Sequence, residues 1–470
     1  MTETPRFAVR EIELYERPVV LRLPFRFGVV TLTQCPQAFA RARIEFADGS
    51  GAWGAAAEMM APKWFDKNLQ LSNEDNFGQL RGVLTMARRA YLGDASPASA
   101  FGHFARHHES HLQAAQARGF NPLLASYGPA LIDRAVLDAL CRHRQMSFHA
   151  AMQANLPGVG ALRPEFAGFD FDTFLRSRQR AGTIEARHTV GLLDAITDAD
   201  LVERVADGLP QTLEEVIRVY GHRYFKLKVG GQTAADLARL EAIAGVLDRS
   251  ADPYFVSLDG NEQYADAHGV AELVDGIRAR PALSRLWQSI LFIEQPVARK
   301  AALDIDLRTA ELGKPVIIDE SDGELGTFAL ARDRGYEGVS SKTCKGLYKS
   351  ILNAARCSRW NTQEGEARYF MSAEDLTTQA GLSVQQDLAL ASLLGITHVE
   401  RNGHHYVDGM AAQGESEQQA FLAAHPDVYE RSHGAVRLKI QRGRIALASL
   451  DCTGYASAAL PDFSAMASLP

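Results

Sequence analysis

The sequence predicts an α/β protein built around a closed barrel of eight parallel strands, preceded by an α+β domain. Eight short apolar runs follow one another over residues 186–409, each separated by a helix-sized interval, and eight βα units are the number that closes a barrel. Residues 1–155 have a different pattern, with antiparallel strand signals followed by helical ones. Residues 410–470 return to short strands and a turn, so we expect them to rejoin the first domain.

The first domain begins with strands and continues with helices. The stretches "FAVREIELYE", "FRFGVVTLTQ" and "AFARARIEFADGSGAWG" contain alternating polar and apolar residues, broken by Pro and by a DGSG turn signal. From roughly residue 73 to 152, apolar residues recur three and four positions apart, as in "NFGQLRGVLTMARRAYL", which predicts amphipathic helices. A connector containing Gly and Pro follows, near residues 156–187.

The eight apolar runs define the predicted barrel. In chain order they are "HTVGLL", "RYFKLKV", "YFVSLDGN", "LFIEQP", "PVIIDES", "GVSSKTCKG", "RYFMSAED" and "ITHVERNG". Amphipathic stretches such as "TAADLARLEAIAGVLDR" and "SVQQDLALASLLG" lie between them. Alternation of this kind is typical of parallel βα repeats.

Composition and net charge indicate what kind of molecule the protein binds. The chain has 470 residues, a net charge of -7 and a pI near 6.1, which argues against nucleic acid or an anionic membrane and favours a small molecule. Five scattered cysteines form no CxxC pair, which indicates a reducing compartment. No signal peptide and no long apolar run is visible, so we expect a cytoplasmic protein.

Charged residues occur at the carboxyl end of one apolar run after another. They are Lys226 and Lys228, Asp259 with Asn261, Glu294, Asp319 with Glu320, and Lys342 with Lys345. Successive groups are 31, 35, 25 and 23 residues apart, each close to one βα unit. Because the carboxyl ends of barrel strands form the rim where active sites are built, we expect these side chains to share one pocket.

Three of these acids form a predicted metal site. Asp259, Glu294 and Asp319 would converge from adjacent strands. Neither Cys nor His joins them, so an all-oxygen site for Mg²⁺ is expected.

Lysines lie on either side of this site. Lys228 ends the second run and Lys342 the sixth, so they would face each other across the barrel. A lysine acts as a base only if its pKa falls well below about 10.4, and the nearby ammonium of Lys226 and a dication would lower it. Two bases across a bound ligand suit racemisation or epimerisation.

The ordered motifs resemble a known family. "FKLKVG", "LDGN", "IEQP", "IIDES" and "SKTCKG" are similar to the successive barrel motifs of the enolase superfamily, in particular the muconate lactonising enzyme and dipeptide epimerase branch of the mandelate racemase/muconate lactonising enzyme family. The resemblance implies a modified TIM barrel, (β/α)7β, with an N-terminal α+β capping domain over residues 1–155 that is completed by the C-terminal tail.

The resemblance also implies a reaction. In this superfamily, a Lys or His base removes a proton α to a carboxylate. The resemblance therefore implies an enediolate held by Mg²⁺. Lys228 and Lys342 match the paired bases, Lys226 matches a neighbour that tunes charge, and Asp259, Glu294 and Asp319 match the metal ligands. An isomerase or a carbon–oxygen lyase is therefore expected, working as a homo-oligomer.

Further residues are predicted to contact the substrate. They are Lys345, Glu320, Asn261, Glu374, Asp375 and Arg26. Glu320 could instead pair with a lysine, and Glu374 or Asp375 could cap a helix. Glu400, Asn402 and His404 belong to "VERNGHHYVDG", the stretch that ends the eighth strand, and are placed either on the substrate or in a hydrogen-bonded loop.

Two other groups are assigned to the surface. His103, His107 and His111 are spaced along one helical face, which we interpret as solvated rather than as a metal site. Lys349 is interpreted as a solvated residue at a helix start.

Several reactions remain open. Epimerisation of an acyl-amino acid or a dipeptide is the leading prediction, cycloisomerisation or elimination (as in an acid-sugar dehydratase or o-succinylbenzoate synthase) is the second, and a barrel that binds a metabolite without turnover is the third.

Overall fold

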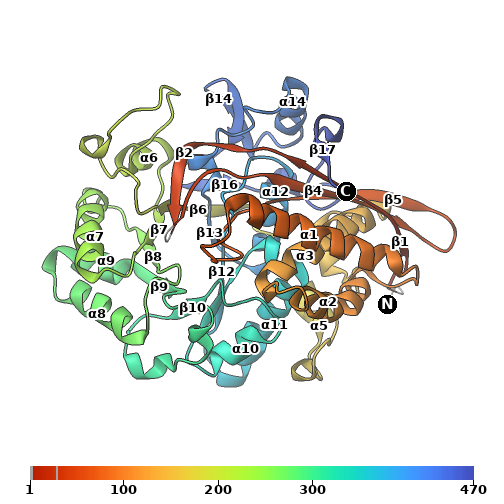
Figure 1. Ribbon diagram of the computed structural model, residues 1–470, viewed down its shortest axis with the longest axis horizontal. Coiled ribbons are helices and arrows are strands. Elements are labelled where there is room, and N and C mark those ends of the chain that lie inside the picture. Colours follow the sequence, from red (N-terminus) through yellow and green to blue (C-terminus); the bar gives the residue numbers. More distant parts are fainter. Residues whose placement is uncertain (1–3, 28–29) are drawn as a thin grey trace.

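The alternating N-terminal stretches form an antiparallel sheet in a computed structural model that describes residues 4–27 and 30–470 (Figure 1). The strand order is β17-β1-β4-β5. The bounds are β1 (Ala8–Arg17), β4 (Gln37–Glu45), β5 (Gly51–Met59) and β17 (Ala467–Ser468). The predicted DGSG turn joins β4 to β5, with the hydroxyl and backbone N–H of Ser50 donating to Asp48 Oδ1 at 2.6 and 2.9 Å.

A separate hairpin lies where the sequence predicted one strand. β2 (Val20–Phe27) pairs antiparallel with β3 (Val30–Gln34). The break comes within "FRFGVVTLTQ", and the hairpin is not part of the four-stranded sheet.

Four helices cover the N-terminal sheet. They are α1 (Asn73–Gly93), α2 (Ala100–Gln116), α3 (Pro122–His143) and α4 (Phe148–Gln153). Each begins after a Ser or Asn whose side chain accepts a backbone N–H of the first turn, which satisfies a donor that the helix leaves free. Helix α3 is buried along almost its whole length and lies directly on β5: a Cβ on Gly54 would come within 2.1 Å of Ala139 N. Only glycine allows this approach.

All eight predicted barrel strands form, and every pair of neighbours is parallel. They are β6 (Thr183–Val190), β7 (Tyr224–Lys228), β8 (Phe255–Asp259), β9 (Ile290–Glu294), β10 (Val316–Ile318), β11 (Gly338–Ser341), β12 (Phe370–Ala373) and β13 (His398–Glu400). The order is β12-β11-β10-β9-β8-β7-β6-β13. Because the eighth strand pairs with the first, the sheet curls into the predicted barrel.

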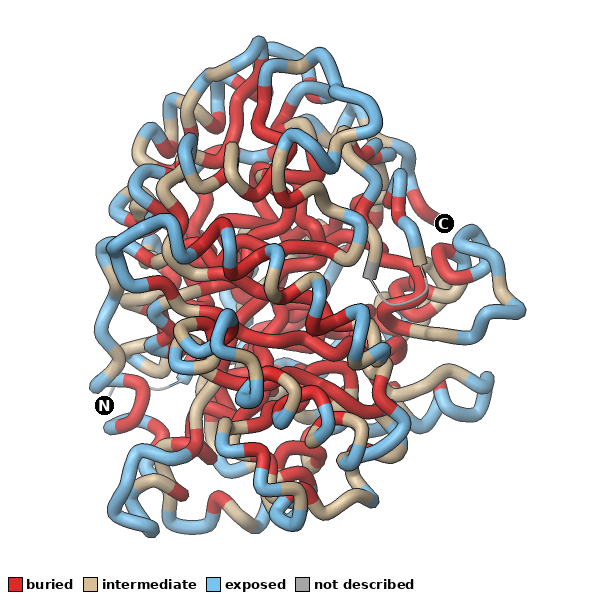
Figure 2. The backbone as a smooth tube through the Cα atoms, turned by 90° about the vertical axis from the view of Figure 1, so that its left-hand side faces the viewer, coloured by how far each residue is buried: buried red, intermediate tan, exposed pale blue. Residues whose placement is uncertain are grey.

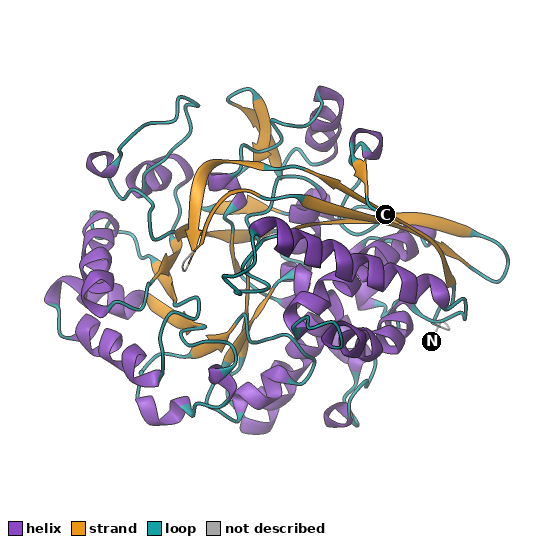
Figure 3. Cartoon of the chain, in the orientation of Figure 1, coloured by secondary structure: helices purple, strands orange, loops and turns teal. Residues whose placement is uncertain are grey.

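Helices surround this barrel (Figure 3). They are α6 (Leu213–Tyr220), α7 (Thr233–Leu247), α8 (Ala267–Arg278), α9 (Ser284–Ser289), α10 (Thr327–Arg332), α11 (Leu347–Glu364) and α12 (Leu382–Leu394), with α5 (Phe171–Arg176) before β6 and α13 (Gly403–Tyr406) after β13. Among the described helices, none combines the length and apolarity needed to cross a membrane.

The C-terminal tail contacts both sheets. After α14 (Glu415–Ala424) and the hairpin of β14 (Tyr429–Ser432) and β15 (Ala435–Leu438), β16 (Arg444–Ala446) pairs antiparallel with β6 of the barrel. β17 then pairs with β1. The tail therefore adds one strand to each sheet.

The apolar core is continuous from the N-terminal sheet into one side of the barrel. Figure 2 shows that the buried segments run through the middle of the molecule. It joins side chains of β4, β5 and α3 to those of α11 and α12, such as Tyr348 and Leu388. A second cluster fills the side of the barrel covered by α7 and α8. The shared core holds the N-terminal domain against the loop that follows β11, at one edge of the barrel mouth.

Candidate active site

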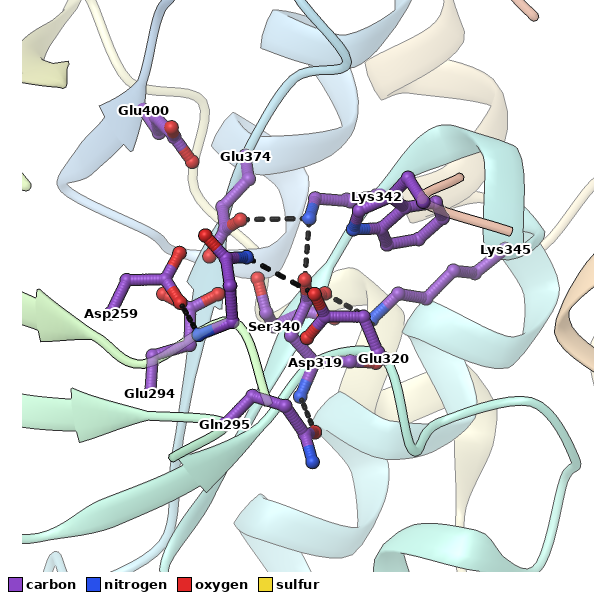
Figure 4. A network of polar contacts seen from close by, with 12 residues as sticks. Asp259, Glu294, Gln295, Asp319, Glu320, Ser340, Lys342, Lys345, Glu374 and Glu400 are labelled. Atoms are coloured by element: carbon purple, nitrogen blue, oxygen red, sulfur yellow. Dashed lines mark hydrogen bonds and ion pairs between the residues drawn. The ribbon is translucent and has the colours of Figure 1, made fainter. Parts of the chain in front are cut away.

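The predicted lysines and acids gather at the carboxyl ends of the barrel strands. Lys226 and Lys228 lie on β7. The acids end β8, β9 and β13 or directly follow β10 and β12 (Figure 4). Alternation along β7 turns both lysines toward the inside of the barrel while Leu227 faces the helices. Both lysine side chains are buried.

Lys226 lies at the centre of the acids. Its Nζ is 2.8 Å from Asp259 Oδ2, 3.0 Å from Glu294 Oε2, 2.7 Å from Glu374 Oε2 and 2.9 Å from Glu400 Oε2. Four carboxylates thus compensate the charge of one ammonium group, which offsets the free-energy cost of burying it.

Two more lysines approach from opposite sides. Lys228 Nζ is 2.6 Å from Asp259 Oδ2. Lys342 Nζ is 2.6 Å from Asp319 Oδ2 and 2.9 Å from Glu374 Oε2, and it lies 4.3 Å from the centre of the Trp64 ring, a favourable cation–π contact.

The acids leave oxygens without hydrogen bonds. One oxygen from each of Glu294, Asp319 and Glu374 lies within 4.8 Å of the others. Within the described chain, both oxygens of Glu294 and of Glu374 and Oδ1 of Asp319 accept no hydrogen bond, although lysine ammonium groups lie near. A buried, all-oxygen donor set of this kind fits a hard divalent cation such as Mg²⁺.

The third predicted ligand is placed differently. Asp259 Oδ1 accepts the backbone N–H of Asn261 at 2.8 Å, and Oδ2 is held by Lys226 and Lys228. Glu374, predicted to contact substrate, instead joins Glu294 and Asp319 in the convergent group.

The ionisable side chains in the site shift one another's pKa values. Burial and then the Glu374 carboxylate raise the pKa of Glu294 well above its ordinary value. Burial also opposes ionisation of Glu374, but the ammonium groups of Lys226 and Lys342 outweigh it and hold that pKa well below its ordinary value. Burial is likewise outweighed at Asp259, where Lys226 and Lys228 lower the pKa to about 2.

The acids around Lys226 and Lys342 act on the pKa of both lysines. Burial would lower the pKa of each, but the surrounding carboxylates, Asp259 foremost for Lys226 and Asp319 for Lys342, raise it well above its ordinary value. The lowered pKa predicted for the two bases depends on a bound dication as well, whose positive charge would act against these carboxylates.

Asn261, Glu320 and Lys345 form the edge of the site. Asn261 Nδ2 donates to Glu320 Oε1 at 3.1 Å, and Lys67 of the N-terminal domain lies 3.7 Å from the same oxygen. Lys345 Nζ donates to the backbone oxygens of Asp319 and Ser340 at 2.7 and 2.8 Å and lies 2.7 Å from Asp319 Oδ1. Lys345 therefore positions Asp319.

Steric crowding explains why the third position of "LDGN" is a glycine. A Cβ on Gly260 would lie 2.6 Å from Pro296 Cα, closer than any side chain allows. The loops after β8 and β9 thus touch backbone to backbone, which fixes Asn261 next to Asp259.

Asp375 and Arg26 have different surroundings. Asp375 accepts backbone N–H groups of Thr377, Asn402 and Gly403 at 3.1 to 3.4 Å, so it holds the loops after β12 and β13 together. Arg26 is half-buried on β2 opposite Thr31, and alternation directs it to the other face from Phe25.

A small cavity lies above the acids. It has a volume of about 30 Å³, roughly the share of one water in the liquid. Its lining residues are Phe25, Leu32, Ala61, Trp64, Lys228, Asn261, Lys342, Glu374, Asp375, Leu376, Thr377, Glu400 and Asn402. Of the six residues predicted to bind substrate, Asn261, Glu374 and Asp375 line it, as do Glu400 at the end of β13 and Asn402 in the loop that follows.

Sequence reasoning found only part of the walls that the N-terminal domain supplies: it placed lid contacts at Arg26, Phe27 and the "MMAPKWF" stretch, which contains Trp64, and missed Phe25 and Leu32. Phe25 and Leu32 come from the β2–β3 hairpin, and Trp64 from the segment after β5. The only available signal was the large apolar residues in these short segments, because the contact itself depends on how the two domains pack.

Glu58 connects the domains at the "KTCK" loop. Its Oε2 accepts from Thr343 Oγ1 at 2.8 Å and pairs with Arg134 Nη2 at 3.0 Å. All three side chains are buried, so the position of Lys342 is tied to the N-terminal sheet.

Two surface assignments are wrong. His103, His107 and His111 are buried, with ring nitrogens of His103 and His111 on the carbonyl oxygens of Phe7 and Ala125 at 2.9 and 3.0 Å. Lys349 is also buried and pairs with Asp322. Helices α2 and α11 each have neighbours on the faces that looked polar.

A larger cavity lies elsewhere. It measures about 650 Å³ and is bordered by the amino ends of β7 and β8 together with α6 and α7. Its lining residues include Tyr254 and His222 and none of the acids at the mouth. We place the active site at the small cavity because the ionisable groups converge there.

Comparisons with solved structures agree with this architecture. A mandelate racemase/muconate lactonizing protein from Herpetosiphon aurantiacus superposes with a TM-score of 0.60 at 16% identity, over 96% of this chain and 98% of that one. A dipeptide epimerase from Enterococcus faecalis V583, complexed with Mg and the dipeptide L-Leu-L-Tyr, gives 0.59 at 15% identity over 96% and 99%. An enolase superfamily member from Roseovarius nubinhibens ISM gives 0.56 at 16% identity over 97% and 96%.

Sequence comparison finds no match for the chain, whereas structure comparison does. No protein-family model and no curated protein matches the chain. The likeness nevertheless extends over nearly the full length of both chains and includes the barrel and the N-terminal sheet. This chain therefore has the fold of the enolase superfamily, in the form found in mandelate racemase/muconate lactonizing proteins and dipeptide epimerases.

Proposed function

We propose that the protein is a Mg²⁺-dependent enzyme that removes a proton α to a carboxylate and returns one, racemising or epimerising its substrate. One observation carries the proposal: Lys228 at the end of β7 and Lys342 directly after β11 line the same cavity, each paired with a different acid of the cluster. A carbon held between them would have one amine on each face.

The acids would hold the metal. We assign Asp259, Glu294 and Asp319 as ligands, with Glu374 adjoining them. Bound there, Mg²⁺ would supply positive charge against the enediolate oxygens. The buried oxygens of Glu294 and Asp319 that accept no hydrogen bond support this assignment.

The other residues would position the reacting groups. Lys226 keeps the acids close together by compensating four of them. Asn261, Glu374 and Asp375 line the cavity and would contact the substrate. Lys345 and Glu320 would fix Asp319 and Asn261, and Arg26 would act at the rim.

The walls favour a substrate with an apolar part. Phe25, Leu32 and Trp64 form an apolar part of the lining, which suits an acyl-amino acid or a dipeptide. The cavity of about 30 Å³ has room for only about one water, so these walls would have to move apart to admit the substrate. The epimerase from Enterococcus faecalis V583 was crystallised with such a dipeptide.

The test is exchange with solvent deuterium. The protein is incubated in D₂O with Mg²⁺ and a panel of dipeptides and acyl-amino acids of both configurations, and α-deuterium is measured by mass spectrometry. We expect label at the α-carbon and interconversion of the epimers. Lys228→Ala and Lys342→Ala should each abolish exchange from one configuration, whereas Lys300→Ala, an exposed lysine, should leave both unchanged.

Other products distinguish the alternatives. Loss of water from the substrate would identify a lyase, and ring closure or opening a cycloisomerase. If no carboxylate is labelled although substrates bind, the proposal of catalysis is wrong and a binding barrel remains.

A further inference from the structure

Three histidines meet on the outer side of the barrel wall, away from the acids. His188 lies on β6, His222 precedes β7, and His404 lies on α13 after β13. Their ring centroids are 5.2 to 5.4 Å apart. Because Arg187 reaches Ser372 of β12 inside the barrel, the next side chain, His188, faces outward.

Each of the three rings has at least one buried nitrogen that makes no hydrogen bond within the described chain. One ring nitrogen from each lies within 4.8 Å of the other two. In the described chain, Nδ1 of His188, Nε2 of His222 and both nitrogens of His404 are buried without a hydrogen bond. His188 and His222 are only 2% and 4% exposed. Buried polar atoms without partners are rare in native proteins and call for an explanation such as an ion.

The tautomer of His222 is fixed in the form that a metal needs. Its Nδ1 donates to the carbonyl oxygen of Ala186 at 2.9 Å, so Nε2 carries the free lone pair. A backbone carbonyl in this position is the usual orienting partner of a metal-bound histidine. Burial lowers the pKa of all three histidines, that of His222 to about 4, which keeps the rings neutral.

Aromatic rings surround the three histidines, and one of the three borders a cavity. Tyr220 packs on His404 and His222 with ring centroids at 5.3 and 5.7 Å. His405 packs on His188 at 5.0 Å. His222 also lines the cavity of about 650 Å³, so an ion would reach the group from that side.

We propose that His188, His222 and His404 form a structural site for a borderline divalent transition metal, Zn²⁺ in the first place, with water as the fourth ligand. Three imidazoles and no thiolate or carboxylate suit Zn²⁺, Co²⁺, Ni²⁺ or Cu²⁺ and disfavour Mg²⁺. Zinc-bound nitrogens in a tetrahedral site lie about 3.3 Å apart, so small ring rotations close the site from the observed spacing.

The bound metal would join three parts of the barrel. It would tie β6 to the residue before β7 and to the loop after β13. That loop carries Asn402, which lines the active-site cavity, and Asp375 already holds its backbone. The inference does not depend on the proposed reaction.

The test separates this site from the acids at the barrel mouth. The purified, metal-stripped full chain is titrated with Zn²⁺ in the presence of excess Mg²⁺, dialysed, and analysed for zinc by mass spectrometry. We expect one retained zinc per chain and a higher Tm. Electron paramagnetic resonance of the Cu²⁺ form of the wild type should show coupling to three nitrogens.

Two variants and a control decide the outcome. His404→Gln and His222→Gln should weaken retention by at least about a hundredfold and remove the Tm rise. His149→Gln changes another partly exposed histidine whose Nε2 has no partner, and it should retain zinc. The proposal is overturned if the wild type retains no zinc, if His404→Gln retains as much as wild type, or if the Cu²⁺ spectrum shows oxygen ligands alone.

Discussion

The barrel mouth and the interior of the N-terminal domain both bury ionisable side chains, but they treat charge in opposite ways. At the mouth, Lys226 touches four acidic side chains, and its ammonium group helps to keep the pKa values of Asp259 and Glu374 below their ordinary values, although that of Glu294 is raised. In the described part of the N-terminal domain, Asp133 pairs with no cation and accepts a hydrogen bond from the hydroxyl of Tyr91 at 2.5 Å, and burial raises the pKa of Asp133 to about 8. Charge is kept where opposite groups can be brought together, and is otherwise given up.

The largest effect is expected from removing the positive charge of Lys226, which compensates the acids at the barrel mouth. Lys226→Met leaves four buried acids without their shared cation, and we expect a loss of roughly 3 to 5 kcal/mol in the free energy of unfolding without Mg²⁺. Added Mg²⁺ should restore part of it, since the ion would replace the missing charge. Urea unfolding with and without Mg²⁺ measures both effects.

The exposed Lys300→Met is the matched control and should change stability by less than about 0.5 kcal/mol. A Lys226→Met protein as stable as the wild type in the absence of Mg²⁺ would show that the lysine does not hold the acids together.

A smaller effect tests the neutral acid of the N-terminal domain. The folded pKa of Asp133, about 8, lies above its unfolded value, so stability falls as pH rises between the two values. Asp133→Asn removes this dependence. Its stability relative to wild type should increase by about 3 kcal/mol between about pH 5 and about pH 8.

Urea unfolding at the two pH values gives the comparison, and the exposed Asp333→Asn controls for the change in net charge. An equal difference at both pH values would mean that Asp133 is ionised in the folded protein.

The smallest effect concerns a buried histidine of the same domain. Burial lowers the pKa of His108 to about 3, below the unfolded value, so its contribution to stability is present above about pH 6.5 and is lost as pH falls. His108→Gln should reduce the loss of stability between about pH 7 and about pH 5 by about 1 to 2 kcal/mol.

Thermal or urea unfolding over this range measures the slope. His268→Gln, with a side chain 81% exposed, should keep the slope of the wild type. If the slope of His108→Gln equals that of the wild type, His108 is not a source of the acid sensitivity.

Most of the barrel could be predicted from the sequence. Eight apolar runs at βα spacing predicted eight strands, and all eight form in the expected order. The same spacing brought Lys228, Glu294 and Lys342 to one rim, because parallel strands place their carboxyl ends at the same edge. The N-terminal sheet followed from its alternation, although the break between β2 and β3 did not.

The remaining features depend on contacts across the fold. Period two fixes the face of a strand on which Lys226 lies, so the sequence by itself determined that Lys226 and Lys228 share the barrel interior. Only the tertiary structure decided that Glu374 and Glu400 would reach Lys226, that Phe25 and Trp64 would cover the cavity, and that His188, His222 and His404 would meet. Local periodicity sets direction along one element, whereas distances between residues far apart in the chain are set by barrel closure and by the packing of one domain on the other.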